Sequence, residues 1–315
     1  VKMARAYTGR SGVIAFSGAF HGRTLMGMAL CGKVLPYKKK FGAMPPEIYH
    51  APFPNEFMGV SIDDSMNALD LLFTSSIDPE RVAAFIVEPV QGEGGFNVAP
   101  TEFLQKLRVL ADKHGIVLIA DEVQTGIART GKLFAMEHSG VAADLVAMAK
   151  GLAGGFPLSA VTGRAEIVDS APVGGIGGTY AGNPLAVAAA GAVLEVIEEE
   201  QLCERSETVG NEIKARLNTI AARPGMEMIG DVRGLGSMVA FELTQPGTKD
   251  ANPVLTQAIV AEAEANGLII LPCGTRGNVV RLLPPLTTPM NHLAEALDML
   301  EAAIISAVAT TSQAA

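Results

Sequence analysis

The sequence predicts an α/β fold in which a larger part carries a mainly parallel sheet and a smaller C-terminal part is α+β. Short apolar runs alternate with amphipathic helical patterns through the middle of the chain, which is typical of βαβ units. After about residue 205 the pattern changes to a mixed succession of helices and strands. The chain has 315 residues, 49% of them hydrophobic, and can bury a large core. We therefore expect a larger domain at residues 1–205 and a smaller one at residues 206–315.

The clearest βαβ unit is predicted in the second quarter of the chain. Residues 83–87 and 116–120 are unbroken apolar runs and are predicted to be buried strands. Residues 101–114 between them form an amphipathic helical pattern, with Thr101 suited to the N-cap and Gly115 to the position past the C-terminus. We therefore expect a parallel sheet that is covered on both faces. The apolar face of the helix consists of Phe103, Leu104, Leu107, Leu110 and Ala111.

Further elements continue this organisation toward the C-terminus. Residues 145–149 are predicted to form a third buried strand, and residues 183–200 a long alanine-rich helix. Residues 238–243 and 268–271 are predicted to be strands of the smaller part. Thr288–Pro289 are suited to be the N-cap and the first residue of a closing helix.

The composition disfavours several classes of protein. A net charge of -9 and a pI near 5.1 argue against a nucleic-acid-binding surface, which requires a basic face. The basic cluster Lys38–Lys40 is interpreted as a solvated loop. No apolar run approaches the roughly 20 residues that a membrane span needs, so no membrane partner is expected. The five histidines show no spacing typical of a metal site, and we expect no metal.

The cysteines indicate a reducing environment. Cys31, Cys203 and Cys273 are far apart, odd in number and match no CxxC pattern. A disulfide framework and a zinc site are therefore not expected. Because no targeting segment is visible either, a cytoplasmic location fits best.

Polar side chains follow each of the three predicted parallel strands. Glu88–Gly95 follows the first strand, Asp121–Gln124 the second and Lys150 the third. Ligands of open parallel α/β sheets bind beyond the carboxyl ends of the strands. We therefore expect these residues to meet at one edge of the sheet and to form a site for a small molecule.

Two of these residues suggest a specific chemistry. Lys150 ends an apolar strand before a glycine-rich segment, where desolvation would lower the pKa of its amine and make it a nucleophile toward a carbonyl. The alternative is a lysine that points into water. Asp121 also ends an apolar strand and needs a partner. That partner is either a protonated pyridinium nitrogen, which would maintain a cofactor as an electron sink, or a helix N-terminus or salt bridge.

Two glycine-rich segments are candidates for phosphate binding. Residues 126–132 nearly match the phosphate loop GxxxxGK[ST], but Leu133 offers no hydroxyl to magnesium, so a nucleotide triphosphatase is disfavoured. Residues 174–180 can present backbone N–H groups and a hydroxyl to a phosphate, or can form a plain loop. They do not follow the GxGxxG spacing, so a dinucleotide site is also disfavoured.

Two isolated arginines are candidates for binding carboxylates. Arg23 and Arg281 both lie beside apolar residues. Arginine holds a carboxylate through two parallel hydrogen bonds, so the pair suits substrates with one or two carboxylates. The alternative is two ordinary surface ion pairs.

Four ordered motifs together resemble the class III (omega) aminotransferases, which depend on pyridoxal 5'-phosphate. The resemblance extends to about residue 305. Within the family it is strongest to the bacterial 4-aminobutyrate aminotransferases, because the ornithine and acetylornithine enzymes tend to have Gly-Gly-Asn-Pro at the fourth motif. The motifs are Glu88–Gly95, Asp121–Gly126, Lys150 with Gly154–Pro157, and Gly178–Pro184.

The resemblance implies a fold type I architecture and a homodimer, able to pair into a dimer of dimers, with active sites at the subunit interface. In such a dimer Thr179 would reach the phosphate of the neighbouring subunit's cofactor. Family members also carry an N-terminal segment ahead of the point where this chain begins. Residues 2–6 resemble the end of a helix that no capping residue precedes, so we expect that this segment is missing here.

The resemblance also assigns roles around the cofactor. Lys150 would carry it as a Schiff base and shuttle a proton, and Asp121 would pair with the pyridinium nitrogen. Gln124 would contact the phenolic oxygen. Phe20 and Val123 would pack on opposite faces of the ring. The cofactor-binding set is completed by His21.

For the substrates, the resemblance implies exchange between 4-aminobutyrate and 2-oxoglutarate, giving succinate semialdehyde and glutamate. Arg23 would bind the distal carboxylate and Arg281 the α-carboxylate. Glu93 would neutralise Arg281 when the donor has no α-carboxylate and swing away in the other half-reaction. Glu88 joins this substrate-binding set. The alternatives are 5-aminovalerate or an ornithine-like donor, or an inactive fragment that retains the fold.

Overall fold

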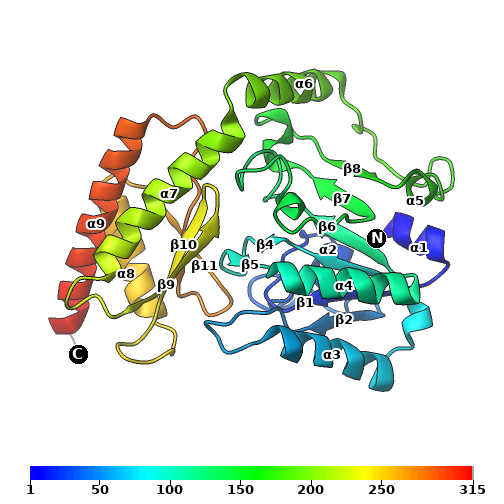
Figure 1. The fold of residues 1–315 in the computed structure, drawn as a ribbon, viewed down its shortest axis with the longest axis horizontal. Helices are drawn as coiled ribbons and strands as arrows, with labels where there is room; N and C mark the ends of the chain where they lie inside the picture. Colours follow the sequence, from blue (N-terminus) through cyan, green and yellow to red (C-terminus); the bar gives the residue numbers. More distant parts are fainter. Residues whose placement is uncertain (314–315) are drawn as a thin grey trace.

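The computed structural model describes residues 1–313, which form two main sheets with separate hydrophobic cores (Figure 1). The larger sheet has six strands, of which five are parallel and the edge strand β8 is antiparallel to β7. The prediction of a mainly parallel sheet is confirmed. In spatial order the strands are β2 (Ile48–Ala51), β1 (Gly12–Phe16), β3 (Val82–Val87), β6 (Val117–Asp121), β7 (Leu145–Met148) and β8 (Ala160–Gly163).

Helices cover both faces of the larger sheet, because successive strand residues point to opposite sides. In β3, Phe85 and Val87 belong to the core beneath α3 and α4. Ala84 and Ile86 belong to the opposite core, which α1, α2 and α5 close (Figure 1). The covering helices are α1 (Lys2–Thr8), α2 (Leu25–Leu30), α3 (Ile62–Ser75), α4 (Thr101–His114) and α5 (Ala165–Val168).

Helix termini agree with the predictions to within a residue. The helix α4 ends at Gly115, which adopts the left-handed conformation with φ 61°. Its N-cap is Pro100 and not the predicted Thr101, because the Pro100 carbonyl already accepts the first helical hydrogen bond. The alanine-rich helix is α6 (Pro184–Glu199), and the Asn183 side chain caps its first two free N–H groups.

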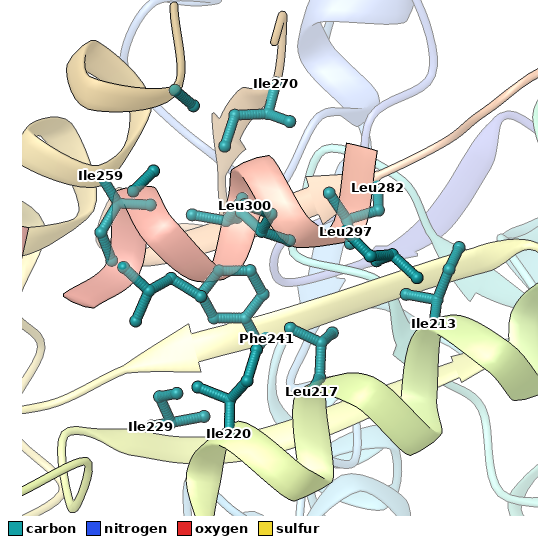
Figure 2. Packing of buried hydrophobic residues seen from close by; sticks show 14 of the residues in the cluster. Ile213, Leu217, Ile220, Ile229, Phe241, Ile259, Ile270, Leu282, Leu297 and Leu300 are labelled. Carbon is teal, nitrogen blue, oxygen red and sulfur yellow. The ribbon is translucent and has the colours of Figure 1, made fainter. Parts of the chain in front are cut away.

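The smaller sheet has four antiparallel strands in the order β11-β12-β10-β9. Three helices pack on one of its faces (Figure 1). Phe241 of β10 lies at the centre of this core among Leu217, Ile259 and Leu300 from the three helices (Figure 2). The elements are α7 (Leu202–Ala221), β9 (Ile229–Leu235), β10 (Met238–Leu243), α8 (Pro253–Ala265), β11 (Leu271–Cys273), β12 (Val279–Leu282) and α9 (Met290–Gln313).

Two elements of this part begin later than the sequence predicts. The strand expected at residues 268–271 is β11, because the N–H of Leu268 bonds back to the last turn of α8 and keeps these first residues out of the sheet. The closing helix α9 begins at Met290. Thr288 does not cap it, because the Thr288 hydroxyl donates to the carbonyl of Pro285.

Helix α7 leads from the larger sheet to the smaller one (Figure 1). Its side chains Val209, Ile213 and Leu217 enter the core of the smaller sheet. The predicted boundary at residue 205 falls in the first turn of α7, and the division into domains stays a prediction. Over residues 1–313, no helix is both long and apolar enough to cross a membrane.

The second face of the smaller sheet packs against a hairpin that follows β3. Met238, Ala240 and Val279 form an apolar cluster with Val90 and Phe96 of this hairpin. The contact brings β12 beside the carboxyl edge of the larger sheet, where the polar segments were expected to meet. The hairpin strands and the short 3-10 helices are β4 (Val90–Gln91), β5 (Asn97–Val98), η1 (Pro79–Arg81), η2 (Ala135–His138) and η3 (Lys150–Ala153).

Candidate functional site

The three predicted polar segments converge, as expected, at the carboxyl edge of the larger sheet. A cavity of about 150 Å³ lies there, between the loops that follow β1, β3, β6 and β7. Eight of the eleven residues that the sequence analysis assigns to the site line it, and Arg23, Thr179 and Arg281 do not. The lining residues are Phe20, His21, Gly22, Glu88, Gly92, Glu93, Asp121, Val123, Gln124 and Lys150.

Lys150 lies just past β7, where the chain leaves the sheet. Its backbone is in the left-handed region, with φ 47°, and starts the 3-10 helix that Gly154 ends. Desolvation lowers the pKa of the Lys150 ammonium group, although Glu88, Glu93 and Asp121 act to raise it. The residue as a whole is still open to solvent at the mouth of the cavity. A reachable amine with a lowered pKa suits attack on a carbonyl.

Asp121 is the last residue of β6 and forms a buried pair with His21. The Asp121 Oδ2 and His21 Nδ1 atoms are 2.7 Å apart, and the second carboxylate oxygen of Asp121 accepts from the N–H of Val123. Burial acts to lower the pKa of His21, but the hydrogen bond and charge of Asp121 outweigh it, so the pKa is raised. The Asp121 carboxylate therefore favours a protonated imidazole at His21. The buried Nε2 atom of His21 has no hydrogen-bond partner among the described residues.

Glu88 is buried in the wall of the cavity and organises the backbone around it. Its carboxylate accepts from the N–H groups of Phe20, at 2.8 Å, and Gly92, at 3.0 Å. Burial raises the pKa of Glu88 to about 7, and the Asp121 charge acts in the same direction while His21 opposes it. Glu88 therefore fixes the position of Phe20. Its substrate-binding role stays a prediction.

Gln124 lies against the loop after β3 and requires glycine there. A Cβ atom at Gly92 would lie 1.9 Å from the Gln124 Oε1 atom, so a side chain at this position would displace the amide. The close approach leaves Val123 and Gln124 on the cavity wall beside Lys150. Sequence reasoning places these residues correctly because they follow β6 directly.

Glu93 and Arg281 form an ion pair between the two parts of the molecule. Arg281 belongs to β12, and its Nη1 atom lies 2.5 Å from Glu93 Oε1. The side chains are only 15% and 26% exposed, so this is not an ordinary surface pair. Burial acts to raise the pKa of Glu93, but Arg281 and the hydroxyl of Tyr37 outweigh it and lower the pKa.

Arg23 is exposed and lies beside two aromatic rings. Its guanidinium carbon is 5.8 Å from the Phe20 ring centre and 5.3 Å from that of Tyr37. The two rings are themselves 4.7 Å apart. Sequence reasoning missed Tyr37, which lies in an irregular segment just before Lys38–Lys40 and gives no periodic signal. Lys39 and Lys40 of that cluster are exposed, as a solvated loop requires.

Two glycine-rich segments do not join this cavity. Thr179 lies in an exposed loop and does not line the cavity of its own chain. Residues 126–132 form turns in place of a phosphate loop, and Arg129 is turned inward to donate to Ser237, at 2.9 Å, and to the Pro284 carbonyl, at 2.6 Å. Within residues 1–313, no group of three histidine, cysteine or acidic side chains is arranged to hold a metal ion.

Comparison with known proteins identifies the family of this chain. The chain matches the family described as aminotransferase class III over residues 1–304. It is 53% identical over 301 residues to the 5-aminovalerate aminotransferase DavT of Pseudomonas putida, covering 96% of this chain and 70% of that protein. It is 50% identical over 301 residues to the 4-aminobutyrate aminotransferase GabT of Escherichia coli, covering 95% of this chain and 70% of that protein.

Solved structures show the same fold. An amine transaminase from an uncultivated Pseudomonas species, solved with pyridoxal phosphate bound, superposes with a TM-score of 0.87 at 30% identity. The match covers 97% of this chain and 73% of that one. A transaminase from the marine bacterium Virgibacillus gives a TM-score of 0.91 at 27% identity, covering 98% and 72%. The expected fold type I architecture is therefore confirmed.

The buried carboxyl of Glu88 predicts a pH-dependent stability. Its pKa is near 7 in the folded chain and near 4.5 when unfolded, so the folded state holds the proton more tightly. Stability should therefore fall as pH rises from about 5 to about 8, and the raised pKa of His21 acts in the same direction. Glu88→Gln should reduce this loss in the free energy of unfolding by up to about 3 kcal/mol, measured by urea unfolding at each pH.

The slope with pH is the quantity to compare, because the amide also leaves one backbone N–H facing an NH₂ group and lowers stability at every pH. Glu264→Gln, on the exposed surface of α8, is the matched control and should keep the parent slope. An unchanged slope in Glu88→Gln would show that Glu88 does not retain its proton in the folded chain.

Proposed function

The chain belongs to the class III aminotransferases, and we propose that it transfers the amino group of 4-aminobutyrate to 2-oxoglutarate, giving succinate semialdehyde and glutamate. The observation that carries the choice of an ω-amino donor is the Glu93–Arg281 ion pair. A donor without an α-carboxylate leaves Arg281 unpaired in a desolvated site, which is costly unless the protein supplies a carboxylate. Glu93 supplies it.

A second donor, 5-aminovalerate, is favoured by the 53% identity to the Pseudomonas putida enzyme. It also lacks an α-carboxylate, so the Glu93–Arg281 pair suits it equally well. The two donors differ by one methylene, which is worth only about 10- to 200-fold in discrimination. The distance between Arg23 and Lys150 would favour one donor length over the other. The ratio of kcat/KM for the two donors measures this preference.

The residues of the cavity fit pyridoxal phosphate, the cofactor of this family. Bound there, the cofactor supplies a carbonyl for amines and a ring that accepts electrons. The carboxylate of Asp121, held by His21, suits a protonated ring nitrogen. Phe20 and Val123 offer apolar walls, and Lys150 offers the amine. The fit supports the roles that the motifs implied for these five residues.

Lys150 is proposed to move the proton of the reaction. The lowered pKa of its ammonium group increases the fraction of neutral amine, which is the form that accepts a proton. Its place at the mouth of the cavity lets it take the proton from the substrate carbon that bears the amino group. Glu88, Glu93 and Asp121 nearby would stabilise the ammonium ion that results.

The two arginines are proposed to hold opposite ends of the substrates. Arg23 is free of an ion pair among the described residues and would bind the distal carboxylate in both half-reactions. Arg281 would bind the α-carboxylate of 2-oxoglutarate or glutamate, after Glu93 has released it. The Glu93 side chain thus alternates between pairing with Arg281 and leaving it to the substrate.

We also propose that two copies of the chain associate through α6 and the loop before it. Figure 1 places α6 at the top of the larger part, away from its sheet. Tyr180 is 85% exposed and Leu185 is 68% exposed, and Val173, Ile176 and Val187 are exposed beside them. Apolar side chains gathered in this way mark an interaction surface. Thr179 lies within it, as its proposed contact with the neighbouring subunit's cofactor requires.

The proposed setting is the cytoplasm. Cys31, Cys203 and Cys273 are all free thiols, as in proteins of reducing compartments.

A spectrum tests the cofactor, the lysine and the donor together. The chain with pyridoxal phosphate should show a visible absorbance band that 4-aminobutyrate removes. Lys150→Ala should slow this removal by about 10²- to 10⁴-fold, whereas the exposed Lys113→Ala should not. Rates with 5-aminovalerate in parallel assign the donor with the larger kcat/KM. A band that neither ω-amino acid changes would contradict the proposed substrate class.

Replacing Glu93 should affect the two half-reactions unequally. Glu93→Gln leaves Arg281 without a charged partner when the ω-amino donor is bound, so kcat/KM for the donor should fall by about tenfold or more. The half-reaction with 2-oxoglutarate should change by less than about threefold, because the substrate itself pairs with Arg281. Single-turnover kinetics of each half-reaction measure this, with Glu264→Gln on the exposed surface of α8 as control. Equal losses in both would refute the switch.

A charge placed on the proposed interface should disrupt association. Leu185→Glu buries an unpaired carboxylate if α6 contacts a second copy, so the dimer should dissociate at least about tenfold more readily in sedimentation velocity. Leu71→Glu on α3, which is 63% exposed on the opposite side of the larger part, should leave the dimer intact (Figure 1). A parent chain that sediments as a monomer would overturn the proposed dimer.

A further inference from the structure

Tyr37 connects three groups that the proposed reaction uses. Its hydroxyl donates to Glu93 Oε2 at 3.1 Å, while Arg281 occupies the Oε1 atom of the same carboxylate. Its ring lies beside Phe20 and beneath the guanidinium of Arg23. The side chain is buried, with 6% of the residue exposed. A buried phenol needs a hydrogen-bond acceptor, and Glu93 provides it.

The backbone of Glu93 is tied to the smaller part of the molecule, so we expect its side chain to be the part that moves. Its backbone carbonyl accepts from the N–H of Gly274 at 3.0 Å, in the loop between β11 and β12. When a substrate carboxylate takes Arg281, the Glu93 carboxylate therefore stays nearby and loses its strongest partner. Among the described residues, the hydroxyl of Tyr37 is the other side-chain group that donates to it.

We propose that Tyr37 is a positioning residue that holds the Glu93 carboxylate when Arg281 binds a dicarboxylate substrate. This inference rests on the proposed function of the site. Tyr37 then helps the site to accept both substrate classes. With an ω-amino donor bound, Glu93 pairs with both Arg281 and Tyr37, and with 2-oxoglutarate bound it keeps only Tyr37. The hydroxyl remains a donor at every working pH, because burial first and the Glu93 charge second raise the pKa of Tyr37 to about 12.

The geometry predicts an asymmetric loss when the hydroxyl is removed. With a monocarboxylate bound, Glu93 keeps Arg281, and little changes. With a dicarboxylate bound, Glu93 would be a half-buried charge without its remaining donor, which weakens binding of that ligand alone. Tyr37→Phe isolates this effect, because the ring that packs against Phe20 and Arg23 is retained.

Binding of unreactive ligands tests this without depending on turnover. Glutarate carries carboxylates for both Arg23 and Arg281, whereas pentanoate carries one, for Arg23. In calorimetry with the cofactor-loaded protein, Tyr37→Phe should raise the Kd of glutarate by about tenfold or more and that of pentanoate by less than about threefold. Tyr49→Phe, at a partly buried tyrosine of β2, is the matched control and should change neither.

A double-mutant cycle shows whether Tyr37 acts through Glu93. In a Glu93→Ala background there is no carboxylate to hold, so adding Tyr37→Phe should leave the Kd of glutarate unchanged. If Tyr37→Phe weakens glutarate equally in both backgrounds, Tyr37 acts on the ligand by another route and the proposal is wrong.

The remaining outcomes also decide the matter. Equal weakening of glutarate and pentanoate would indicate a purely structural tyrosine, and tighter glutarate binding would mean that Tyr37 favours the Arg281-paired state of Glu93. Either result overturns the inference and leaves the proposed function intact. If the parent protein binds pentanoate at least as tightly as glutarate, Arg23 and Arg281 do not bind the two carboxylates together. That result would refute both the proposed function and this role of Tyr37.

Discussion

Three buried or half-buried carboxylates share one small site, and the need to pair each of them determines the arrangement around it. An ionised carboxylate removed from water is costly unless hydrogen bonds or opposite charges replace the lost hydration. Glu88 accepts from two backbone N–H groups, which oppose the rise in pKa that its burial causes. Asp121 uses His21. Glu93 uses Arg281 and the hydroxyl of Tyr37. The different partners give three chemically identical groups three different properties.

The pairing of Glu93 also makes the site depend on the contact between the two sheets. Arg281 reaches it from β12, and the guanidinium of Arg233 donates to the Gly95 carbonyl at 2.9 Å in the same region. Arg129 crosses in the other direction, to Ser237 and Pro284. The apolar cluster between the smaller sheet and the β4–β5 hairpin supports these contacts. The substrate end of the cavity therefore depends on how the two parts pack together, whereas Lys150 and Asp121 both belong to the larger part.

The fold makes the amine of Lys150 reactive while holding its backbone in an unfavourable conformation. Its left-handed backbone is uncommon for a residue with a side chain, and such strain persists where the surrounding structure imposes it. Its amine lies in a desolvating environment among acidic groups, so the two influences on its pKa oppose each other. Desolvation prevails, which favours the neutral amine, while the carboxylates remain available to stabilise the charged form.

The sequence by itself determined the fold class and, to within one residue, the carboxyl ends of the parallel strands β3, β6 and β7. Apolar periodicity and chain order are local properties, so they located β3, α4, β6 and β7 and placed Asp121 and Lys150 at one edge of the sheet. The ordered motifs indicated the family, which the comparisons confirmed. Errors were small shifts, as at Thr101, where backbone hydrogen bonding and not side-chain preference set the helix start.

Only the tertiary structure decided which side chains meet. His21 and Asp121 are 100 residues apart, and no local pattern records this pair. Glu93 and Arg281 are 188 apart, and only the family resemblance implied that they would pair. Tyr37 lies in a segment without periodicity, and its partners come from two other segments, around residues 20–23 and at Glu93. Such contacts arise from the docking of separate elements and from loop conformations, which depend on the whole packed molecule and not on the residues nearby in the chain.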